Sequence, residues 1–586
     1  MDSIGKAAYR WTLRPLENED LVRGVAGELN NLAPSLARAL VLRGIGNKRA
    51  AQAFFRDGLE SLHDPFQMRD MREAAERLAE AIARNERVLV YGDYDVDGTT
   101  STALMVLFLR SFGVEAEFFI PNRFIHGYGL CQAGLTQAQA SGATLVVALD
   151  CGITAHAEAD FARSLGLDLV ICDHHTPDVG RIPNAFAILN PKRSDCEYPF
   201  KELSGCGVGF KLIQATLAVL GRPAEEAFEY LDLVAVSTAS DIVPLYGENR
   251  VLMREGLLQL NRSTRPGLGE LARIANTTLD GLTASQIVFQ IGPRINAAGR
   301  IDCASKAVDL LIASDRVDAA RLADELEVMN LKRRELDQTT RDEAIRMAEE
   351  RMDAHPDDTF AFVLHAPHWH AGVIGITASR VAEHFHRPAV MLSGADGEAK
   401  GSARSAGRIN IHQALSECSD LLTRFGGHAF AAGLALPTDD IPELRERLSQ
   451  AVGRMVTPEA FEPELEIDAN LDLDDLNGRF WAVLRQFAPH GPDNPRPLFW
   501  SQGLRQVGTP ETMGKEKKHL MLRVTAEGGG SSFRAIGFGL GHLHSTALHA
   551  ARRGLPLDLV YDVDENHYRG QSSLQLRLKD LRVQEA

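Results

Sequence analysis

The chain has 586 residues, of which 45% are hydrophobic, 24% charged and 6% aromatic. That length exceeds what one hydrophobic core usually organises, so we expect three or four domains, and the composition excludes disordered, collagen-like and disulfide-rich classes. The formal net charge of −16 argues against a protein that coats duplex DNA by bulk attraction, but it leaves room for a narrow basic track that guides a single strand.

The first residues and the cysteines indicate a cellular compartment. Met1–Leu16 lacks the pattern of a secretion signal, and the sequence has no apolar run of roughly 18 residues that would span a bilayer. The seven cysteines form no Cys-x-x-Cys pair and are odd in number, which argues against a zinc ribbon or a secreted disulfide framework. We therefore expect a cytoplasmic protein with buried thiols.

Helix and strand patterns alternate along the first half of the chain. Residues 1–65 form an N-terminal extension with helical patterns at 32–42 and 48–59, which we expect to pack on the main domain. Helices are predicted at 72–84, 99–112 and 154–165, and short apolar strands at 87–91, 114–120, 144–149, 167–172 and 185–189. This alternation predicts a doubly wound parallel sheet within residues 66–313, where ligands bind at the carboxyl ends of the strands.

Three further regions follow. Residues 314–355 lack Gly and Pro and predict a long connecting helix with Leu322, Leu326 and Met329 on its apolar side. Residues 356–460 predict a second α/β domain that begins with a strand at 360–364. Residues 461–586 alternate strands and turns, which predicts a small C-terminal β-domain.

The first strand of the parallel sheet runs into an acidic loop that contains Asp93, Asp95 and Asp97. Carboxylates at alternate positions raise one another's pKa unless a cation compensates them. Oxygen ligands suit Mg²⁺ or Mn²⁺. An Asp-rich cap on the following helix is the alternative interpretation.

Two other predicted strands also end in groups that bind metals, namely Asp150 and the run Asp173, His174 and His175. Alone, Asp150 could cap the next helix and the histidines could be polar surface. Together, three strand ends at one sheet edge predict a two-metal site that hydrolyses phosphodiesters, in which Asp150 bridges the metals and one histidine contacts phosphate or serves as an acid. Asp241, after an apolar helix, could complete the ligand set.

Glycine-rich and basic segments predict contacts to a nucleic acid. The segment at 426–433 offers backbone amides for a phosphate, and tight packing of a glycine turn is the alternative. The candidate side chains are Ser402, Arg404, Ser405 and Arg408 near that segment, Arg294, Asn296 and Arg300 in a predicted Gly/Ala-rich turn, and Arg123, His126 and Tyr128 in another loop.

These motifs resemble the DHH phosphoesterase superfamily, which is named for the residues that stand here at 173–175, and the loop GDYDVDGTTST at 92–102 resembles its RecJ branch. The likeness extends over nearly the whole chain, through SGCGVG at 204–209, GPRINAAGR at 292–300, WHAGVIG at 369–375 and GGHAFAAG at 426–433. It implies a DHH catalytic domain, a DHH-associated nucleic-acid-binding domain and a C-terminal OB-type barrel.

The resemblance also implies roles for particular residues. The metal ligands would be Asp93, Asp95, Asp97, Asp150, Asp173, His174 and Asp241, with Asp93 and Asp173 as ligands or orienting groups; the catalytic set would be Asp97, Asp150, His174 and His175. Nucleic-acid contacts would be Arg123, Tyr128, Arg294, Asn296, Arg300, His370, Arg380, Ser402, Arg404, Ser405, Gly427 and His428, with Lys515, Lys517, Lys518, Phe533 and Arg534 in the barrel. One departure is Tyr91, where the wider superfamily often has a histidine; Asp93 could substitute.

The resemblance implies a single-stranded-DNA-specific 5′-to-3′ exonuclease that uses Mn²⁺ or Mg²⁺, releases 5′-mononucleotides and acts in DNA repair and recombination. By the same resemblance we expect a monomer whose partners are a single-strand-binding protein and a helicase. The alternatives are a small-substrate or nanoRNA phosphodiesterase, an inorganic pyrophosphatase, and a non-catalytic replication scaffold.

Overall fold

The computed structural model describes residues 9–263, 265–395, 397–407, 409–568 and 571–584. The chain divides into two compact units: Gly58–Glu462 forms one, and Met1–Asp57 joins Pro463–Ala586 in the other. The expectation that the N-terminal extension packs on the main domain is therefore wrong for residues 9–57, whose buried side chains belong to the core of the C-terminal domain, whereas Leu59 and Leu62 do pack on the main domain.

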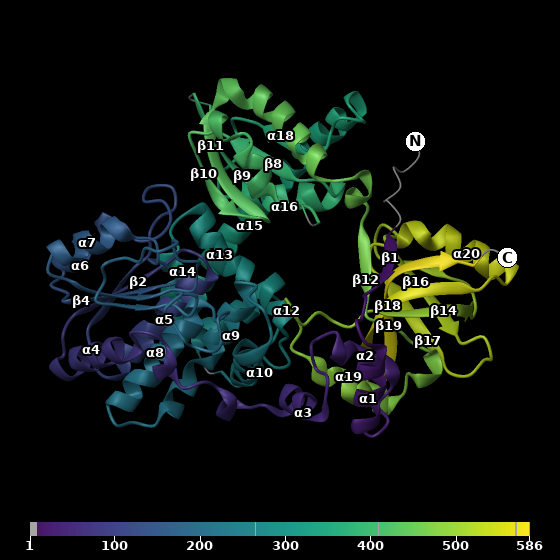
Figure 1. Cartoon of the computed structure of the whole chain (residues 1–586), viewed down its shortest axis with the longest axis horizontal. Coiled ribbons are helices and arrows are strands. Elements are labelled where there is room, and N and C mark those ends of the chain that lie inside the picture. The colour runs from purple at the N-terminus through teal and green to yellow at the C-terminus, as the bar shows by residue number, and fades with distance from the viewer. Residues whose placement is uncertain (1–8, 264, 396, 408, 569–570, 585–586) are drawn as a thin grey trace. The chain divides into compact units, whose positions relative to one another are not determined.

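A five-stranded parallel sheet organises the first domain of unit Gly58–Glu462, with strand order β3-β2-β4-β5-β6 (Figure 1). Its strands are β2 (Val88–Gly92), β3 (Ala116–Phe119), β4 (Leu145–Leu149), β5 (Asp168–Cys172) and β6 (Ala187–Leu189). The helices that accompany them are α4 (Met71–Arg84), α5 (Val96–Ser111), α6 (Gln132–Ala140), α7 (His156–Ser164) and α8 (Gly205–Val219). The doubly wound parallel sheet that the sequence predicts is confirmed.

Both faces of this sheet are buried, because successive side chains of a strand point to opposite faces. Val88 and Val90 of β2 belong to the core that includes α4, α5 and α8. Leu89 and Tyr91 belong to the core on the other face, with α6 and α7. The uninterrupted apolar strands of the sequence reflect this burial on two sides.

A helical region follows the sheet, and most of it packs into the same core. It comprises α9 (Leu231–Ser240), α10 (Gly247–Asn261), α11 (Pro266–Ile274), α12 (Ala284–Gln286), a π-helical turn at Ile287–Ile291, α13 (Gly292–Ile301) and α14 (Ser305–Ile312). The turn predicted around Arg294, Asn296 and Arg300 is wrong, since these residues lie within α13. Pro293 at the first turn favours this helix.

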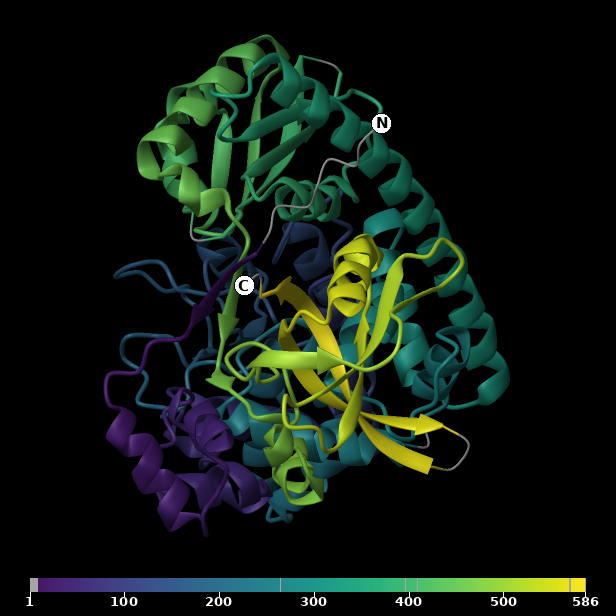
Figure 2. The ribbon, with the colours of Figure 1, turned by 90° about the vertical axis from the view of Figure 1, so that its right-hand side faces the viewer.

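The predicted connecting helix is α15 (Arg316–Ala354), which Figure 2 shows along its full length. Leu322, Leu326 and Met329 pack into the core of the first domain, as expected. Ala344 and Ala348, farther along the helix, pack into a core of the second domain. One continuous helix thus belongs to both domains.

The second domain of this unit is built on a mixed sheet of order β10-β11-β9-β8-β7, in which only β7 and β8 are parallel. Its elements are β7 (Phe362–His365), α16 (Ile374–Phe385), β8 (Ala389–Ser393), β9 (Glu398–Arg404), α17 (Ile411–Ser416), β10 (Arg424–His428), β11 (Ala431–Pro437) and α18 (Ile441–Met455). The glycine segment at 426–433 therefore forms the β10–β11 hairpin.

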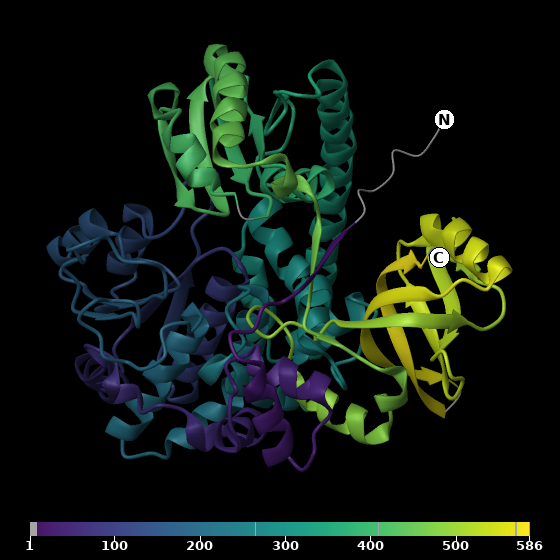
Figure 3. The same cartoon turned by 45° about the vertical axis from the view of Figure 1, so that its right-hand side comes forward.

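The other unit joins the two ends of the chain. Its first residues supply β1 (Arg10–Leu13), α1 (Glu19–Glu28), α2 (Pro34–Val41) and α3 (Lys48–Arg56). The later residues supply β12 (Glu464–Ile467), β13 (Ala469–Asn470), α19 (Gly478–Leu484), β14 (Phe499–Gln506), β15 (Glu511–Met513), β16 (His519–Thr525), β17 (Ser532–Gly537), α20 (His544–Arg553), β18 (Leu557–Tyr568) and β19 (Gln571–Val583). β14 pairs with both β18 and β16, which closes the sheet into the predicted barrel (Figure 3).

Two sequence expectations concern burial. Five of the cysteines are buried, but Cys131 and Cys303 are partly exposed, so the expectation of buried thiols is wrong for these two. In the part of the chain that the structure describes, no helix combines the length and the hydrophobicity that crossing a membrane requires.

Candidate active site

The carboxyl edge of the parallel sheet gathers the acidic residues that the sequence singles out. Gly92 of β2 pairs with Leu149 of β4, and Leu149 pairs with Cys172 of β5. Asp93, Asp150 and Asp173 are the next residues of the three strands, so the strand register places them side by side. β2 lies between β3 and β4, where the strand order reverses, and ligands bind at such a switch point.

Seven side chains converge at this edge. Three overlapping groups each offer ligand atoms within 4.8 Å of one another. The groups are Asp150 with His174 and His175, Asp97 with His174 and Asp241, and Asp93 with Asp95 and Asp150. Asp150 and His174 each belong to two groups, which is the arrangement that a site for two ions requires.

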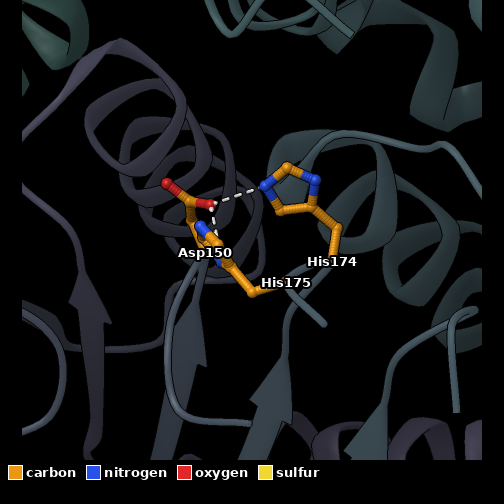
Figure 4. A group of neighbouring side chains, drawn as sticks. All are labelled: Asp150, His174 and His175. Atoms are coloured by element: carbon orange, nitrogen blue, oxygen red, sulfur yellow. Dashed lines mark ion pairs between the residues drawn. The ribbon is translucent and has the colours of Figure 1, made fainter. Parts of the chain in front are cut away.

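Asp150 lies at the centre of the cluster, and Figure 4 shows its carboxylate between the two imidazoles. Its Oδ1 lies 3.2 Å from His174 Nε2 and 4.0 Å from His175 Nδ1. The backbone of Asp150 has a φ of +62°, a left-handed conformation that is uncommon for a residue with a side chain. Such strain clusters at functional sites.

His174 completes the centre of the site. Its Nε2 lies 3.5 Å from Asp241 Oδ2 and 3.6 Å from Asp97 Oδ2, in addition to its contact with Asp150. Asp241 comes directly after α9, as the sequence predicts. One imidazole nitrogen therefore faces three carboxylates from three different elements.

The N-terminus of α8 holds the Asp97 carboxylate. The backbone amides of Gly205 and Cys206 donate to its two oxygens at 2.7 and 2.8 Å. The Ser237 hydroxyl donates to Asp97 Oδ1 at 2.7 Å and lies 2.8 Å from Ser204 Oγ. A Cβ at Gly205 would lie 2.7 Å from Asp150 Cβ, so a glycine is needed where α8 approaches the site.

Asp173 is occupied differently from the other acids. Its Oδ2 accepts from the Ile153 amide at 2.9 Å, and its Oδ1 accepts from the His174 and His175 amides at 2.7 and 3.0 Å. Oδ1 also lies 2.7 Å from His175 Nδ1. Asp173 belongs to none of the three ligand groups among the described residues, and its contacts orient the two histidines.

The electrostatics of the cluster are unbalanced without a cation. Burial, followed by repulsion from neighbouring carboxylates, raises the pKa of Asp93, Asp95, Asp150 and Asp241. Burial lowers the pKa of His174. Asp93 Oδ1, Asp150 Oδ1 and both ring nitrogens of His174 are buried without a hydrogen-bond partner in the described chain. Oxygen and imidazole ligands with surplus negative charge fit a divalent cation.

The helix-cap interpretation of the acidic loop holds in part. α5 begins at Val96, three residues earlier than predicted, and the side chain of Asp95 caps it by accepting from the Gly98 amide at 3.1 Å. Asp95 also belongs to a ligand group. Tyr91 takes no part in the cluster, because its hydroxyl donates to the Gly129 carbonyl at 2.9 Å. Asp150 caps no helix, since Ala155 is the N-cap of α7.

Arginines gather beside the cluster within the same unit. The Arg300 Nη1 donates to the Gly372 carbonyl at 3.1 Å. Burial, followed by the nearby charges of Arg123 and Arg333, lowers the pKa of Arg300 to about 10. The charge of Asp95 opposes this lowering of the pKa, and the charge of Arg404 adds to it. A Cβ at Gly372 would lie 2.2 Å from the Arg300 carbonyl oxygen, so the glycine of the 369–375 motif permits this close approach.

Some of the other predicted contact residues lie near aromatic rings or His175, and others already bind protein groups. Arg123 stacks on Tyr94 at 4.2 Å, Phe124 contacts His370 with ring centroids 5.7 Å apart, and the Tyr128 hydroxyl lies 3.1 Å from His175 Nε2. Four other predicted groups are already engaged by protein, namely Arg294 by Glu327, Arg380 by Asp337, Arg404 by Ser402 and Ser405 by the Ile409 carbonyl.

The remaining predicted contact residues differ in their exposure to solvent. Gly427 and His428 are exposed on β10 and Asn296 is half-buried on α13, and His126 packs on Phe119. Arg408 lies outside the described residues. In the barrel, Lys515, Lys517 and Lys518 are exposed, Arg534 contacts Met513, and Phe533 belongs to the hydrophobic core.

Three residues near the site carry no motif in the sequence. Ser237 reaches Asp97 from α9, Arg333 adds a buried guanidinium from α15, and Ile242 follows Asp241 with an exposed side chain. The Ser-Thr-Ala-Ser run before Asp241 is the one signal that could have indicated Ser237.

The chain was compared with known families and proteins. The model of the DHH family, N-terminal domain, matches residues 87–238, that of the DHHA1 domain matches 358–454, and that of the RecJ OB domain matches 467–580. The single-stranded-DNA-specific exonuclease RecJ of Bacillus subtilis is 37% identical over 98% of this chain and 71% of its own length. The chain belongs to the RecJ family.

Other relatives agree with this placement in the RecJ family. RecJ of Escherichia coli is 36% identical over 94% of this chain and 96% of its own length. The crystal structure of Thermus thermophilus RecJ in complex with Mn²⁺ has a TM-score of 0.81 at 30% identity and covers 99% of this chain and 80% of that one. The corresponding complex with Mg²⁺ has a TM-score of 0.76 at 29% identity, over 99% and 79% of the two chains.

Proposed function

We propose that this chain is a metal-dependent exonuclease that degrades single-stranded DNA from its 5′ end and releases 5′-mononucleotides. The observation that carries the proposal is the cluster at the edge of the parallel sheet, where His174 Nε2 lies within 3.6 Å of three carboxylates. Membership of the RecJ family supports the substrate, because its curated relatives are named single-stranded-DNA-specific exonucleases.

Two divalent ions, Mn²⁺ or Mg²⁺, fit the cluster. One set of ligands would be Asp97, His174 and Asp241, and the other would be Asp93, Asp95 and Asp150. Bound there, the ions supply hydroxide from water and stabilise charge on the phosphodiester. Asp150 would contribute to both sets, because it belongs to the second group and its Oδ1 also lies 3.2 Å from His174 Nε2 of the first.

The protein side chains fix the geometry of that reaction. Asp97 is held by two amides and the Ser237 hydroxyl, so its carboxylate cannot rotate away from the site. Asp173 holds His175 through Nδ1, and the Tyr128 hydroxyl lies 3.1 Å from Nε2. We assign to His175 a contact with the phosphate or the transfer of a proton at Nε2, and to Asp173 the orientation of that ring.

Arg123, Arg300 and Arg333 supply positive charge for the strand. Their mutual repulsion, which contributes to the lowered pKa of Arg300, favours an anion between them. Arginine pairs with phosphate through fixed donors, and a 5′-terminal phosphate next to the acidic cluster would set the direction of digestion. Tyr128, Phe124 and His370 provide aromatic surface for bases.

A digestion experiment tests this function. Oligonucleotides labelled at the 5′ or the 3′ end are incubated with protein and Mn²⁺, Mg²⁺ or a chelator. We expect immediate release of a labelled mononucleotide from the 5′-labelled strand, progressive shortening of the 3′-labelled strand, and no reaction with the chelator. Intact DNA together with hydrolysis of short RNA, a dinucleotide or pyrophosphate would instead indicate a small-substrate phosphohydrolase.

Variants separate catalysis from a scaffold role. Asp150→Asn is expected to reduce cleavage by at least about 1000-fold and to weaken Mn²⁺ binding in calorimetry. The matched control is Asp353→Asn, which changes an exposed carboxylate at the end of α15 and is expected to leave both values unchanged. Full biological activity of the Asp150→Asn protein would favour a non-catalytic scaffold.

Its assembly is part of the same proposal. We infer a monomer that works with a single-strand-binding protein and a helicase, because these associates follow from RecJ-family membership. Light scattering after gel filtration is expected to give the monomer mass. Co-sedimentation with purified single-strand-binding protein tests the first partner. We expect a complex that sediments faster than either protein, and its absence would contradict the proposed interaction.

A further inference from the structure

Ile242 directly follows Asp241 and has an unusual backbone. Its φ is +61°, at the position after the C-terminal residues of α9. Glycine or asparagine normally occupies such a left-handed position at a helix end, and a β-branched residue there is a genuine outlier. The chain therefore holds isoleucine where its side chain is sterically unfavourable.

The segments on both sides of Ile242 impose this conformation. α9 precedes it, with buried Leu233, Val234 and Val236. Val243 and Leu245 are buried after it, and the Pro244 carbonyl accepts from Asn249 Nδ2 at 3.0 Å. Because the backbone is fixed on both sides, the conformation does not depend on packing by the Ile242 side chain.

The Ile242 side chain is 62% exposed, so it contributes little to the core. Its neighbour Asp241 reaches the centre of the site, with Oδ2 3.5 Å from His174 Nε2. A strained, exposed and apolar residue beside a catalytic cluster stabilises neither the fold nor a charge. Strain of this kind persists where it serves function.

We propose that Ile242 is a substrate-contact residue that packs on the deoxyribose of the nucleotide whose phosphate is held at the cluster. This inference rests on the proposed function. An isoleucine offers no charge for a phosphate and no hydrogen bond for a base edge, whereas the sugar presents a C–H surface next to the scissile phosphate. Covering that surface removes apolar area of both partners from water.

The test compares Ile242→Gly with the native protein by steady-state cleavage of a single-stranded oligonucleotide, thermal unfolding and Mn²⁺ calorimetry. Glycine relieves the backbone strain, so we expect Tm to stay the same or rise. We expect KM to increase about 5- to 10-fold from the lost apolar contact, with kcat changed less than twofold and Mn²⁺ affinity retained. Ile242→Val, which keeps a branched apolar side chain, is expected to restore most of the KM.

Asn85→Gly is the matched backbone control. Asn85 is an exposed residue at the end of α4 with a φ of +51°, so this substitution removes a side chain from a left-handed position outside the acidic cluster. We expect its KM to equal that of the native protein. A rise in KM equal to that of Ile242→Gly would overturn the proposed contact.

Four other outcomes are also decisive. An unchanged KM for Ile242→Gly overturns the proposal, and a parallel loss of Mn²⁺ affinity shows that Ile242 acts through Asp241 instead. A strand with abasic sites distinguishes sugar from base: the KM ratio between native and variant protein should persist on it, and its disappearance assigns the contact to the base. Failure of the native protein to cleave single-stranded DNA would refute the proposed function itself, independently of these comparisons.

Discussion

Ser237 shows how a single hydroxyl can support the site without contacting substrate. It donates to Asp97 Oδ1 at 2.7 Å and is fully buried. Substitution of a group that orients a metal ligand typically reduces metal affinity or activity 10- to 100-fold. We predict that Ser237→Ala weakens Mn²⁺ binding about tenfold in calorimetry, while the far-ultraviolet circular dichroism spectrum stays native. Ser237→Ala protein with native Mn²⁺ affinity would show that the two backbone amides hold Asp97 unaided.

Arg300 is half-buried near other arginines, and its lowered pKa records the cost of that position. An apolar side chain of similar length removes this cost. We predict that Arg300→Met raises Tm and at the same time weakens binding of single-stranded DNA about tenfold. The dependence of log Kd on log salt should fall by roughly 0.7 if one phosphate contact is lost. Fluorescence anisotropy in chelator measures both quantities, and Arg346→Met, on the exposed side of α15, is the control.

The sequence identifies the ligand types but not their use. Asp95, Asp97, Asp150, His174 and Asp241 converge as expected because three of the four segments follow strands in one parallel register or begin the adjoining helix. That both oxygens of Asp173 are occupied by backbone amides depends on the local turn, which residue types do not encode. The sequence does not indicate Arg333 either, because nothing distinguishes one arginine from the other charged residues of a helix.

At the scale of elements, Glu343 connects α15 to the loop after β7. It accepts from Trp369 Nε1 at 2.8 Å and lies 2.9 Å from His368 Nε2. The Trp369 hydrogen bond holds the pKa of Glu343 below its ordinary value against the smaller, opposing effect of burial, and His368 adds to the lowering. This junction positions the loop that carries His370.

A carboxyl with a lowered pKa in the folded state stabilises the fold at pH values above its unfolded pKa, and that contribution disappears as pH falls through the folded value. We therefore predict that Glu343→Gln lowers stability by about 0.5 kcal/mol at pH 7, since the pair is largely solvent-screened. The difference from native protein should shrink below about pH 4.3. Urea unfolding followed by tryptophan fluorescence measures it; a difference that grows on acidification would contradict this origin.

Elements with apolar periodicity were predictable, and elements made of small residues were not. The strands of the parallel sheet and α15 lie within a few residues of their predicted positions. The sequence predicts a turn where α13 lies and offers a glycine turn as one alternative where β10 lies, because Gly292, Gly299, Gly426 and Gly427 suggest breaks. In α13 the glycine has a packing reason instead: a Cβ at Gly299 would lie 2.6 Å from the Tyr94 carbonyl oxygen.

At the scale of the whole molecule, the N-terminal segment completes the C-terminal domain. β1 pairs in parallel with β12, and Trp11 Nε1 donates to Asp580 at 2.8 Å. Leu36 and Leu40 of α2 are fully buried in the core that also contains Phe487 and Phe499. The sequence shows helices in this segment but gives no sign of their partner, because amphipathic patterns do not specify which surface they cover.

We predict different outcomes for the two parts when they are produced alone. Residues 58–462 contain complete cores and should fold with a cooperative thermal transition. Residues 463–586 lack the N-terminal helices whose buried side chains share one core with Leu471 and Phe480, and they should aggregate or melt far below the intact protein. Adding a peptide of residues 9–57 should restore folded structure, as measured by circular dichroism. A stable, cooperative 463–586 fragment would refute the dependence.

The pairing of the two chain ends has a consequence for biosynthesis. The helices within residues 9–57 are translated before the catalytic unit, and the strands that share their core are translated after it. Their apolar faces stay without a native partner while the entire catalytic unit is synthesised and folds. We expect nascent protein to hold these helices in chaperone-bound or loosely collapsed form until synthesis of the C-terminal strands lets the shared core form.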